Sequence, residues 1–261
     1  KKKIKFFFKE FFLKKNKKKL LNKVNKVLSS GIFTNGIETK KFEEKFAKFN
    51  KIKYCLALNS GTSALHLALK SIKIKQNDEV IIPATTFIAT PAAVIYCHAK
   101  PVFVDINNNN WLIDIDQIEN KITKKTKAII VVHLHGLMLD MIKLSKIAKK
   151  YNLKIIEDAS QAHGSTFLGK FPGYFSDIAT FSFYPTKTLG SFGEGGAIIT
   201  KNNKLYNKIY SMRDWSKKNN DFLNIGHNYR MPELIATLLI ESLKVLKQDL
   251  PRYVESDPVV I

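Results

Sequence analysis

Arginine is scarce in this chain of 261 residues. The 43 basic residues comprise three arginines, Arg213, Arg230 and Arg252, and forty lysines that are spread along the whole sequence. The formal net charge is +21. Base recognition and bidentate phosphate contacts favour Arg over Lys. The composition therefore argues against nucleic acid as a partner, in spite of the charge, and indicates a compositional bias toward Lys, Asn and Ile.

Cysteine is nearly absent, and long apolar runs are missing. Cys55 and Cys97 lie far apart and do not have the spacing of metal ligands, so we predict two buried thiols in a reducing compartment, the cytoplasm. No apolar run reaches the about 20 residues that a transmembrane helix needs. We therefore predict a chain without a transmembrane segment.

The N-terminal segment 4–15 has apolar residues at helical spacing but is interrupted by charges, which is atypical of a signal peptide. It could lie on a membrane surface or pack as an arm on a neighbouring subunit, and we favour the arm. The basic stretch 14–28 predicts an amphipathic helix that ends at the Ser-Ser-Gly sequence of residues 29–31.

What the sequence does contain is an alternation of short apolar runs with helical patterns, in a chain that is 45% hydrophobic. Continuous apolar strands separated by helices predict an α/β fold with a mostly parallel, seven-stranded sheet between helices. The predicted strands are Tyr54–Leu58, Val80–Ile82, Pro101–Asp105, Ala128–Leu134, Lys154–Asp158, Ile178–Phe183 and Ala197–Thr200. The further predicted helices are 43–49, Ala64–Ile72, Thr90–His98, Ile115–Ile122, Met141–Tyr151, Asn203–Met212 and Pro232–Lys247.

One lysine stands in an unusual setting. Pro185 fixes the backbone ahead of Lys187, and four glycines between residues 190 and 196 let the chain or a ligand come close. Any one of forty lysines is usually a solvated surface charge, but a lysine held rigidly in a buried cleft loses its proton more readily and attacks carbonyls. We therefore predict that Lys187 forms a Schiff base.

Ligands of such folds bind at the carboxyl ends of the strands, where several polar residues stand. Residues 60–63 open a helix and suit a phosphate, although ordinary N-capping is the commoner use. Asp158 ends a buried strand, where a carboxylate needs a cation such as a protonated pyridine nitrogen, unless it caps a helix. Phe87 either stacks on a flat ring or lies in the core.

Two histidines and one arginine complete the candidates. His133 and His135 alternate on a predicted strand and so share a face, but zinc needs a third ligand, and we predict no metal site. Arg230 either grips a carboxylate or lies on the surface. Together, the candidates at the strand ends of this one sheet predict a pyridoxal-phosphate site. They comprise a phosphate site, a partner for a pyridinium nitrogen, an aromatic ring that can stack and a lysine that can form a Schiff base.

Seven segments of the chain resemble, in order, the DegT/DnrJ/EryC1/StrS sugar aminotransferases over residues 30–247. The resemblance implies the fold of the large domain of fold-type-I, aspartate-aminotransferase-like enzymes that depend on pyridoxal phosphate. It also implies transfer of an amino group from glutamate to a keto-sugar nucleotide in amino-sugar and cell-surface polysaccharide biosynthesis. The segments are NSGTSALHLAL, DEVIIPATTFIAT, KPVFVDI, KAIIVVHLHG, IIEDASQAHGS, DIATFSFYPTKTLGSFGEGGAIIT and NYRM.

The same resemblance assigns roles to individual residues. Lys187 is similar to the lysine that binds the cofactor as a Schiff base, and Asp158 to the partner of its pyridine nitrogen. Gln161 resembles a contact to the ring or its 3′-oxygen, and Phe87 the stacking aromatic. Asn228 resembles a residue that reaches the phosphate of the neighbouring subunit, which implies a homodimer with shared sites. The residues that resemble phosphate ligands within the chain are Gly61, Thr62, Ser63 and Ser182.

The chain departs from the resemblance at both ends. We expect residues 1–30 to form a basic arm and helix, residues 31–235 the cofactor-binding large domain, and residues 236–261 a connecting helix with the truncated start of a small domain. Relatives use that small domain to close over the site. An alternative to the aminotransferase is therefore a truncated, catalytically impaired homologue that retains the fold or the cofactor site.

Overall fold

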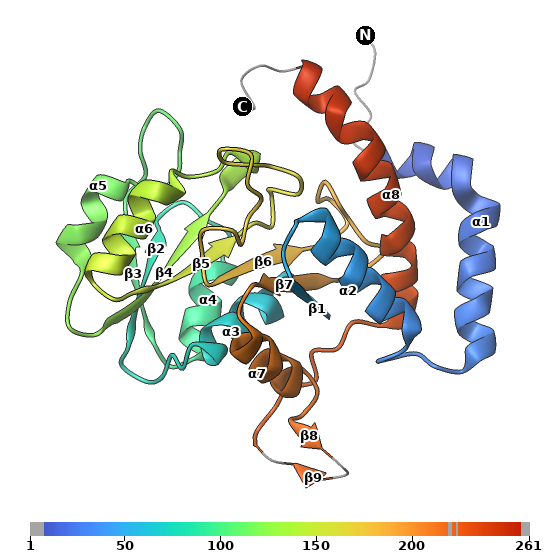
Figure 1. The fold of residues 1–261 in the computed structure, drawn as a ribbon, viewed down its shortest axis with the longest axis horizontal. Coiled ribbons are helices and arrows are strands. Elements are labelled where there is room, and N and C mark those ends of the chain that lie inside the picture. Colours follow the sequence, from blue (N-terminus) through green and yellow to red (C-terminus); the bar gives the residue numbers. More distant parts are fainter. Residues whose placement is uncertain (1–7, 219–220, 223, 257–261) are drawn as a thin grey trace.

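A seven-stranded sheet with helices on both faces forms the body of the protein (Figure 1). The computed structural model describes residues 8–218, 221–222 and 224–256. The strand order is β1-β7-β6-β5-β4-β2-β3. The strands are β1 (Tyr54–Leu58), β2 (Glu79–Pro83), β3 (Lys100–Val104), β4 (Thr126–Val132), β5 (Lys154–Asp158), β6 (Ile178–Ser182) and β7 (Gly196–Thr200). All seven predicted strands are present, and β1 and β5 have the predicted bounds.

The sheet is mostly parallel, as predicted. The pairs β2–β3, β2–β4, β4–β5 and β5–β6 are parallel, whereas β7 runs antiparallel to both β1 and β6. The reason lies in the connection between β6 and β7, which is the loop 183–195 without a crossover helix. A strand that returns through such a loop must run back along its neighbour. The loop of Lys187 is this return connection.

The helices agree with the predicted ones except at their ends. They are α1 (Phe8–Ser30), α2 (Ile37–Phe49), α3 (Gly61–Ser71), α4 (Ala89–Tyr96), α5 (Ile115–Ile118), α6 (Met141–Lys150), α7 (Asn203–Arg213) and α8 (Glu233–Ser256). A 3₁₀ turn, Glu119–Lys121, follows α5. The sequence did not predict the small hairpin of β8 (Lys217–Lys218) and β9 (Asp221–Phe222).

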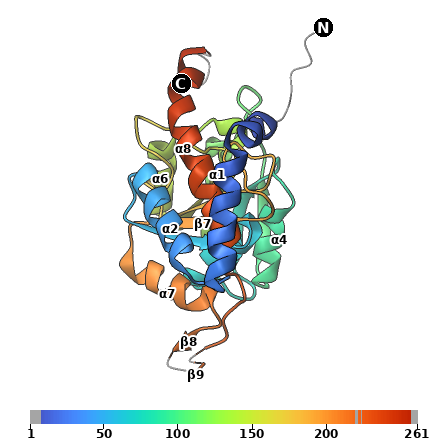
Figure 2. The same cartoon turned by 90° about the vertical axis from the view of Figure 1, so that its right-hand side faces the viewer.

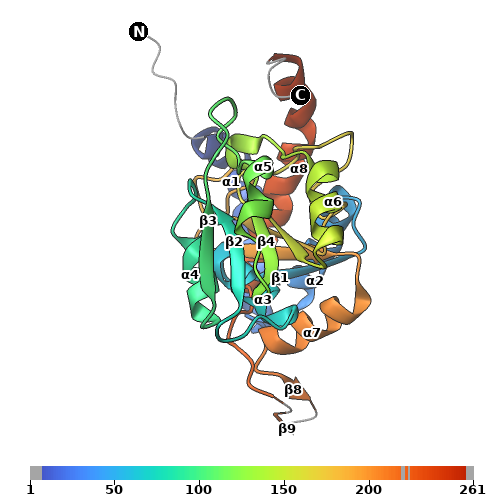
Figure 3. The ribbon, with the colours of Figure 1, turned by 90° about the vertical axis from the view of Figure 1, so that its left-hand side faces the viewer.

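Alternate residues of the strands face two helical layers. Ile130 and Ile156 pack with α3, α4 and α7, while their neighbours Ile129 and Ile155 pack with α6. Figure 3 shows α4 and α6 on opposite sides of the sheet. The two layers cover both faces of the sheet, which is why most of its strand residues are apolar.

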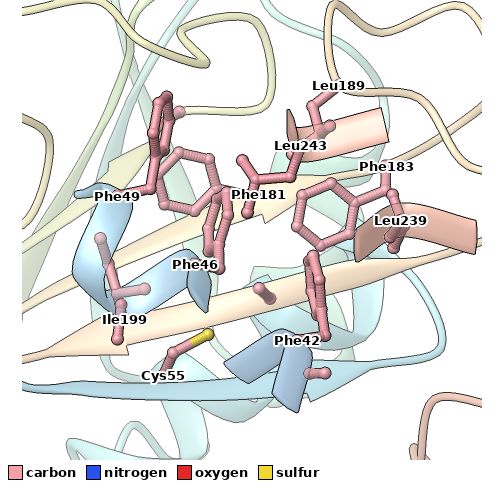
Figure 4. Packing of buried hydrophobic residues seen from close by; sticks show 14 of the residues in the cluster. Phe42, Phe46, Phe49, Cys55, Phe181, Phe183, Leu189, Ile199, Leu239 and Leu243 are labelled. Carbon is pink, nitrogen blue, oxygen red and sulfur yellow. The ribbon is translucent and has the colours of Figure 1, made fainter. Parts of the chain in front are cut away.

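A cluster of aromatic rings lies between the sheet, α2 and α8 (Figure 4). The ring of Phe46 packs edge-on against Phe181 and Phe183 with centroids 4.9 and 5.3 Å away, and Phe42 meets Phe183 in the same way at 5.3 Å. All four side chains are fully buried. Because Phe183 directly follows β6, this packing holds the start of the loop that carries Lys187.

Helix α1 lies outside α8, as the view in Figure 2 shows. Lys19 of α1 forms an ion pair of 2.6 Å with Glu241 of α8, whose side chain is almost completely buried. The predicted arm begins in residues 1–7, which lie outside the described residues. In the part of the chain that the structure describes, no helix has both the length and the apolar character required to cross a membrane.

Helix α2 begins at Ile37, six residues before the predicted start. The buried carboxylate of Glu233, from the first turn of α8, accepts hydrogen bonds from the amides of Gly36 (3.1 Å), Glu38 (2.8 Å) and Thr39 (3.0 Å) and from the Thr39 hydroxyl. These are amides at the helix start that lack acceptors within the helix. A carboxylate at this position also opposes the positive end of the helix dipole.

We expect the substitution Glu233→Gln to destabilise the protein by about 3 kcal/mol, because it replaces an acceptor of several bonds with a donor that faces other donors. Urea unfolding measures the change. The exposed Glu44 of α2, the helix that Glu233 caps, provides the control, since Glu44→Gln is expected to change stability by less than about 0.5 kcal/mol. Equal effects of the two substitutions would contradict the capping role.

Candidate active site

Several predicted site residues meet where β5 and β6 end and α3 and α4 begin. Gly61, the first residue of α3, lies against the end of β6, because a Cβ added at Gly61 would stand 2.7 Å from the Cβ of Ser182. On the next strand, Asp158 accepts a hydrogen bond of 3.3 Å from Thr90 of α4. These contacts bring two helix starts and two strand ends to one edge of the sheet.

The start of α3 presents free amide groups. Ser60 is the N-cap, and its Oγ accepts a hydrogen bond of 3.0 Å from the amide of Ser63 and lies 2.9 Å from the Ser63 hydroxyl. The amides of Gly61 and Thr62, in the first turn, have no acceptor within the helix. Capping and anion binding thus use different groups, since Ser60 caps while these amides, with the helix dipole, suit an anion.

Asp158 is a buried carboxylate, 6% exposed, at the end of β5. Its Oδ1 accepts a hydrogen bond from the amide of Ser160 at 3.1 Å, and Thr90, which contacts Oδ2, lies 2.8 Å from the hydroxyl of Thr86. Among the described residues no Lys, Arg or His lies within ion-pair distance of it. A turn and no helix follows Asp158, so the alternative that Asp158 caps a helix is wrong. A buried carboxylate without a cation fits a cationic ligand group.

Gln161 follows Asp158 in the same turn region and has a fixed orientation. Its Oε1 accepts a hydrogen bond of 2.9 Å from the amide of His135, which follows β4. Because the oxygen is occupied, the amide nitrogen of Gln161 is the group that remains to donate to a ligand.

Lys187 is half-buried, whereas a position in a buried cleft was expected. Short hydrogen bonds shape its loop. The amide of Lys187 donates to the carbonyl of Tyr184 at 2.9 Å, and Phe183 bonds to Gly195 and Ser191 through its amide and carbonyl, each at 2.7 Å. Gly193 has a φ of 151°, a conformation that requires glycine. The loop therefore holds Lys187 on a rigid base.

His163, two residues after Gln161, lies beneath this loop, and from the sequence it was interpreted as a structural residue. It is 4% exposed, and its ring lies 5.5 Å from Phe181 and 5.7 Å from Phe183 between ring centroids. Burial, together with the positive charge of Lys187, lowers the pKa of His163 to about 3. The imidazole is therefore neutral at any physiological pH. Its aromatic contacts are a tertiary feature that no local spacing indicates.

Phe87 lies one residue after Thr86, and its carbonyl accepts a hydrogen bond of 3.0 Å from the amide of Thr90. Its side chain is 72% exposed, so the alternative that it belongs to the core is wrong. An exposed aromatic ring at the start of α4, next to the threonine pair that contacts Asp158, is open to stacking on a ligand.

The two histidines that were expected to share a strand face do not do so, because β4 ends at Val132. His133 is buried and its Nε2 lies 2.7 Å from Glu157, whereas His135 is exposed with a φ of 55°. Since the amide of Leu139 donates to Nδ1 of His133, Nε2 carries the proton and donates to Glu157. The pair ties β4 to β5 on the face away from Asp158. Across the described residues, no three His, Cys, Asp or Glu side chains are placed to hold a metal ion.

The loop with Asn228 lies beside the strand end that leads into α3. The amide of Asn59 donates to the carbonyl of Tyr229 at 2.9 Å, and the Asn59 side chain donates to the carbonyl of Asn228 at 3.3 Å. Of the two alternatives for Arg230, the structure shows the contact with a carboxylate, since its Nη1 lies 3.0 Å from Oδ1 of Asp214 within the chain. Asn228 itself is exposed.

The comparison with known proteins gives a consistent family. A model of the DegT/DnrJ/EryC1/StrS aminotransferase family matches residues 14–253. The chain is 44% identical over 233 residues to the dTDP-3-amino-3,6-dideoxy-alpha-D-galactopyranose transaminase of Aneurinibacillus thermoaerophilus. The aligned region covers 89% of this chain and 64% of that protein. It is also 41% identical over 225 residues to the GDP-perosamine synthase of Escherichia coli O157:H7, and this aligned region covers 85% of this chain and 62% of that protein.

Solved structures agree with this result. DesV of S. venezuelae superposes with a TM-score of 0.89 at 35% identity, covering 92% of this chain and 65% of that one. NtdA of Bacillus subtilis with bound cofactor PMP superposes with a TM-score of 0.84 at 36% identity, covering 92% of this chain and 57% of that one. The chain thus spans less than two thirds of the length of these relatives. Because the family model covers most of the chain and the identities exceed 40% over the matched region, the chain belongs to the DegT/DnrJ/EryC1/StrS aminotransferase family.

Proposed function

We propose that the protein is a pyridoxal-phosphate-dependent aminotransferase that moves an amino group from glutamate to a keto-sugar nucleotide in amino-sugar biosynthesis. The observation that carries the proposal is Asp158, a buried carboxylate without a cationic partner among the described residues, at the edge of the sheet where the free amides of α3 and the rigid loop of Lys187 also lie. The relatives named above are transaminases or synthases of nucleotide-linked amino sugars, which supports this substrate class.

The residues present fit the phosphate end of this cofactor. The amides of Gly61 and Thr62 and the positive end of α3 suit a phosphate dianion. The hydroxyls of Thr62, Ser63 and Ser182 would add further donors. Ser182 lies against Gly61, so the phosphate ligands come from one small region of the fold.

The residues also fit the ring of the cofactor. Asp158 would hold a proton on the pyridine nitrogen, and Thr90 and the amide of Ser160 keep its carboxylate in place. Gln161 would donate its amide N–H to the ring oxygen, since its own oxygen is occupied by the amide of His135. Phe87 would cover one face of the ring. These assignments agree with residues 31–235 forming the cofactor-binding domain.

When bound, pyridoxal phosphate supplies a carbonyl that accepts the amino group and an electron-withdrawing ring. The chain's own residues bind it and move protons. Lys187 would hold the cofactor through its amine, and its Nζ, when free, would accept the proton from the α-carbon of the amino donor as a general base and donate it back as a general acid. Asp158 keeps the ring nitrogen protonated throughout. In the second half-reaction the same groups act in reverse on the keto-sugar.

We propose a homodimer in which Asn228 reaches the phosphate of the neighbouring subunit. Asn228 is exposed, and so are apolar side chains around α4, which a second subunit would cover. These exposed residues are Phe87, Ile88, Ile95, Tyr96 and Phe103. The cytoplasm is the proposed location, supported by Cys55 and Cys97, which are both buried and free.

Mass spectrometry of the products tests the function. The purified chain is incubated with pyridoxal phosphate, glutamate and each member of a panel of keto-sugar nucleotides. We expect one amino-sugar nucleotide and an equal amount of 2-oxoglutarate. A cofactor spectrum without product from any member would support the impaired homologue, and the absence of both spectrum and product would overturn the proposal.

A further inference from the structure

We propose that Arg230 is a positioning residue, which locks the side-chain amide of Asn228 so that its NH₂ group, and not its oxygen, faces the cofactor phosphate. The inference rests on the proposed function and adds to it a residue that does not itself touch the ligand. It follows from a line of four side chains that connects Asn35, Asp214, Arg230 and Asn228.

The contact between Arg230 and Asn228 fixes the orientation of the amide. Nε and Nη2 of Arg230 lie 3.2 and 2.8 Å from Oδ1 of Asn228. The guanidinium has only donors, so the atom that it grips must be the oxygen of the amide. Two donors on one oxygen oppose rotation by 180°, since a rotated amide would direct its own N–H groups at the guanidinium. The NH₂ group therefore points away from Arg230.

A second contact fixes Arg230 in turn. Its Nη1 lies 3.0 Å from Oδ1 of Asp214, and Oδ2 of Asp214 accepts a hydrogen bond of 2.7 Å from Asn35. All three nitrogens of the guanidinium are thus engaged on one plane, which a lysine could not reproduce. The side chains of Arg230 and Asp214 are 25% and 31% exposed, so water screens their charges and orientation is the larger part of their role.

The main chain of this loop is held by other contacts. The amide of Asn59 donates to the carbonyl of Tyr229, and Asp214 and Asn228 form an antiparallel bridge. The hydroxyl of Tyr229 lies 3.1 Å from Nδ1 of the buried His66, and the ring of His227 stacks on that of Tyr229 at 4.9 Å. A variant that loses the Arg230 side chain keeps these anchors, so it should fold and lose only the lock on the amide.

The locked orientation suits an anion. A phosphate has acceptors only, so the NH₂ group of Asn228 can donate to it, whereas the amide oxygen would repel it. Without the lock the amide populates both orientations and must be ordered when the ligand binds. Removing one donor to a charged ligand weakens binding by about tenfold or more.

A double-mutant cycle on the affinity for pyridoxal phosphate tests the proposal. The dissociation constant is measured by absorbance for the full chain and for Arg230→Met, Asn228→Ala and the double variant. We expect each single substitution to weaken binding about tenfold, and the double variant to bind like Asn228→Ala, because Arg230 acts through Asn228. Arg230→Lys should not restore affinity, and Asp214→Asn should weaken binding only while Asn228 is present.

The control is Lys217→Met, which removes a positive charge from the same region at an exposed residue, and we expect its affinity to be unchanged. Thermal unfolding of each variant shows whether it is folded, and Arg230→Gln serves as a second variant. Wild-type affinity in Arg230→Met, or effects of Arg230 and Asn228 that multiply, would overturn the positioning role alone. A wild-type chain that binds no pyridoxal phosphate would overturn the proposed function, and this role with it.

Discussion

The Lys187→Ala variant is expected to lack the absorbance band of the lysine-bound cofactor and to transfer amino groups at least about 10³-fold more slowly than the wild type. The amine of Lys187 is proposed both to hold the cofactor and to carry the proton of the reaction, and alanine supplies neither function. Its loop is closed by hydrogen bonds between main-chain atoms of Phe183, Ser191 and Gly195. The variant should therefore fold and keep the residues that are proposed to bind the cofactor phosphate.

The lysine content of the chain makes a matched control necessary. Lys149 is an exposed lysine of α6, on the face of the sheet opposite α3 and α4, and Lys149→Ala should leave both the spectrum and the rate unchanged. Absorbance between 300 and 500 nm and the rate of 2-oxoglutarate release measure the two effects. A Lys187→Ala protein that kept the wild-type spectrum would show that another of the forty lysines binds the cofactor.

Strands and helix interiors were predictable from local sequence. The bounds of β1 matched because it is a continuous apolar run that ends at turn residues, and those of β5 because charged residues flank its apolar pair Ile155 and Ile156. Helix α2 was predicted short because its cap, Glu233, lies almost 200 residues away in the chain. Its first turn has no local capping signal, and only tertiary packing supplies one. The hairpin of β8 and β9 was missed since two-residue strands have no pattern to detect.

In the candidate site, too, the sequence predicted the local features but not the contacts that the tertiary fold makes. The sequence identified the strand ends and the residue types, because ligands of parallel sheets bind there. It could not identify the neighbours that orient them. Thr90, which contacts Asp158, and Asp214, which holds Arg230, are linked to their partners only by the fold. The pair Thr86 and Thr90, four residues apart at a helix start, is the one local signal that was overlooked.

His133 shows how a wrong strand end changes an interpretation. The predicted strand extended β4 by two residues, to Leu134, and so placed His133 and His135 on one face, although no metal site was predicted there. The chain instead turns after Val132, and His133 is committed to Glu157 by a hydrogen bond of 2.7 Å between fully buried groups. Glu157 also accepts bonds from the amide of Gly173 and the hydroxyl of Ser176, so its charge is compensated locally.

Within the described part of the chain, the carboxylate of Asp158 accepts only two hydrogen bonds, of 3.1 Å from Ser160 and 3.3 Å from Thr90, whereas that of Glu157 accepts three shorter ones. This difference between two adjacent carboxylates of β5 leads to the second large effect. We expect Asp158→Asn to lower the rate of amino transfer about 10²- to 10⁴-fold, because an amide cannot hold a proton on the ring nitrogen. In the cofactor-free protein the same change should leave stability unaltered or raise it by about 1 kcal/mol, since it removes a buried charge that lacks a counter-ion.

Asp177, which lies at the opposite end of the same strand pair, provides the matched control. It forms an ion pair of 2.9 Å with Lys154 and accepts a bond of 3.0 Å from the amide of Ile155. Asp177→Asn should therefore lower stability by about 1 kcal/mol and leave the rate of the cofactor-loaded protein nearly unchanged. Urea unfolding of the cofactor-free variants and steady-state transfer rates measure both quantities. If Asp158→Asn destabilised the protein as Asp177→Asn does and left the transfer rate unchanged, Asp158 would be a structural residue. A carboxylate that binds the ligand is expected to show the reverse, a lower rate without a loss of stability.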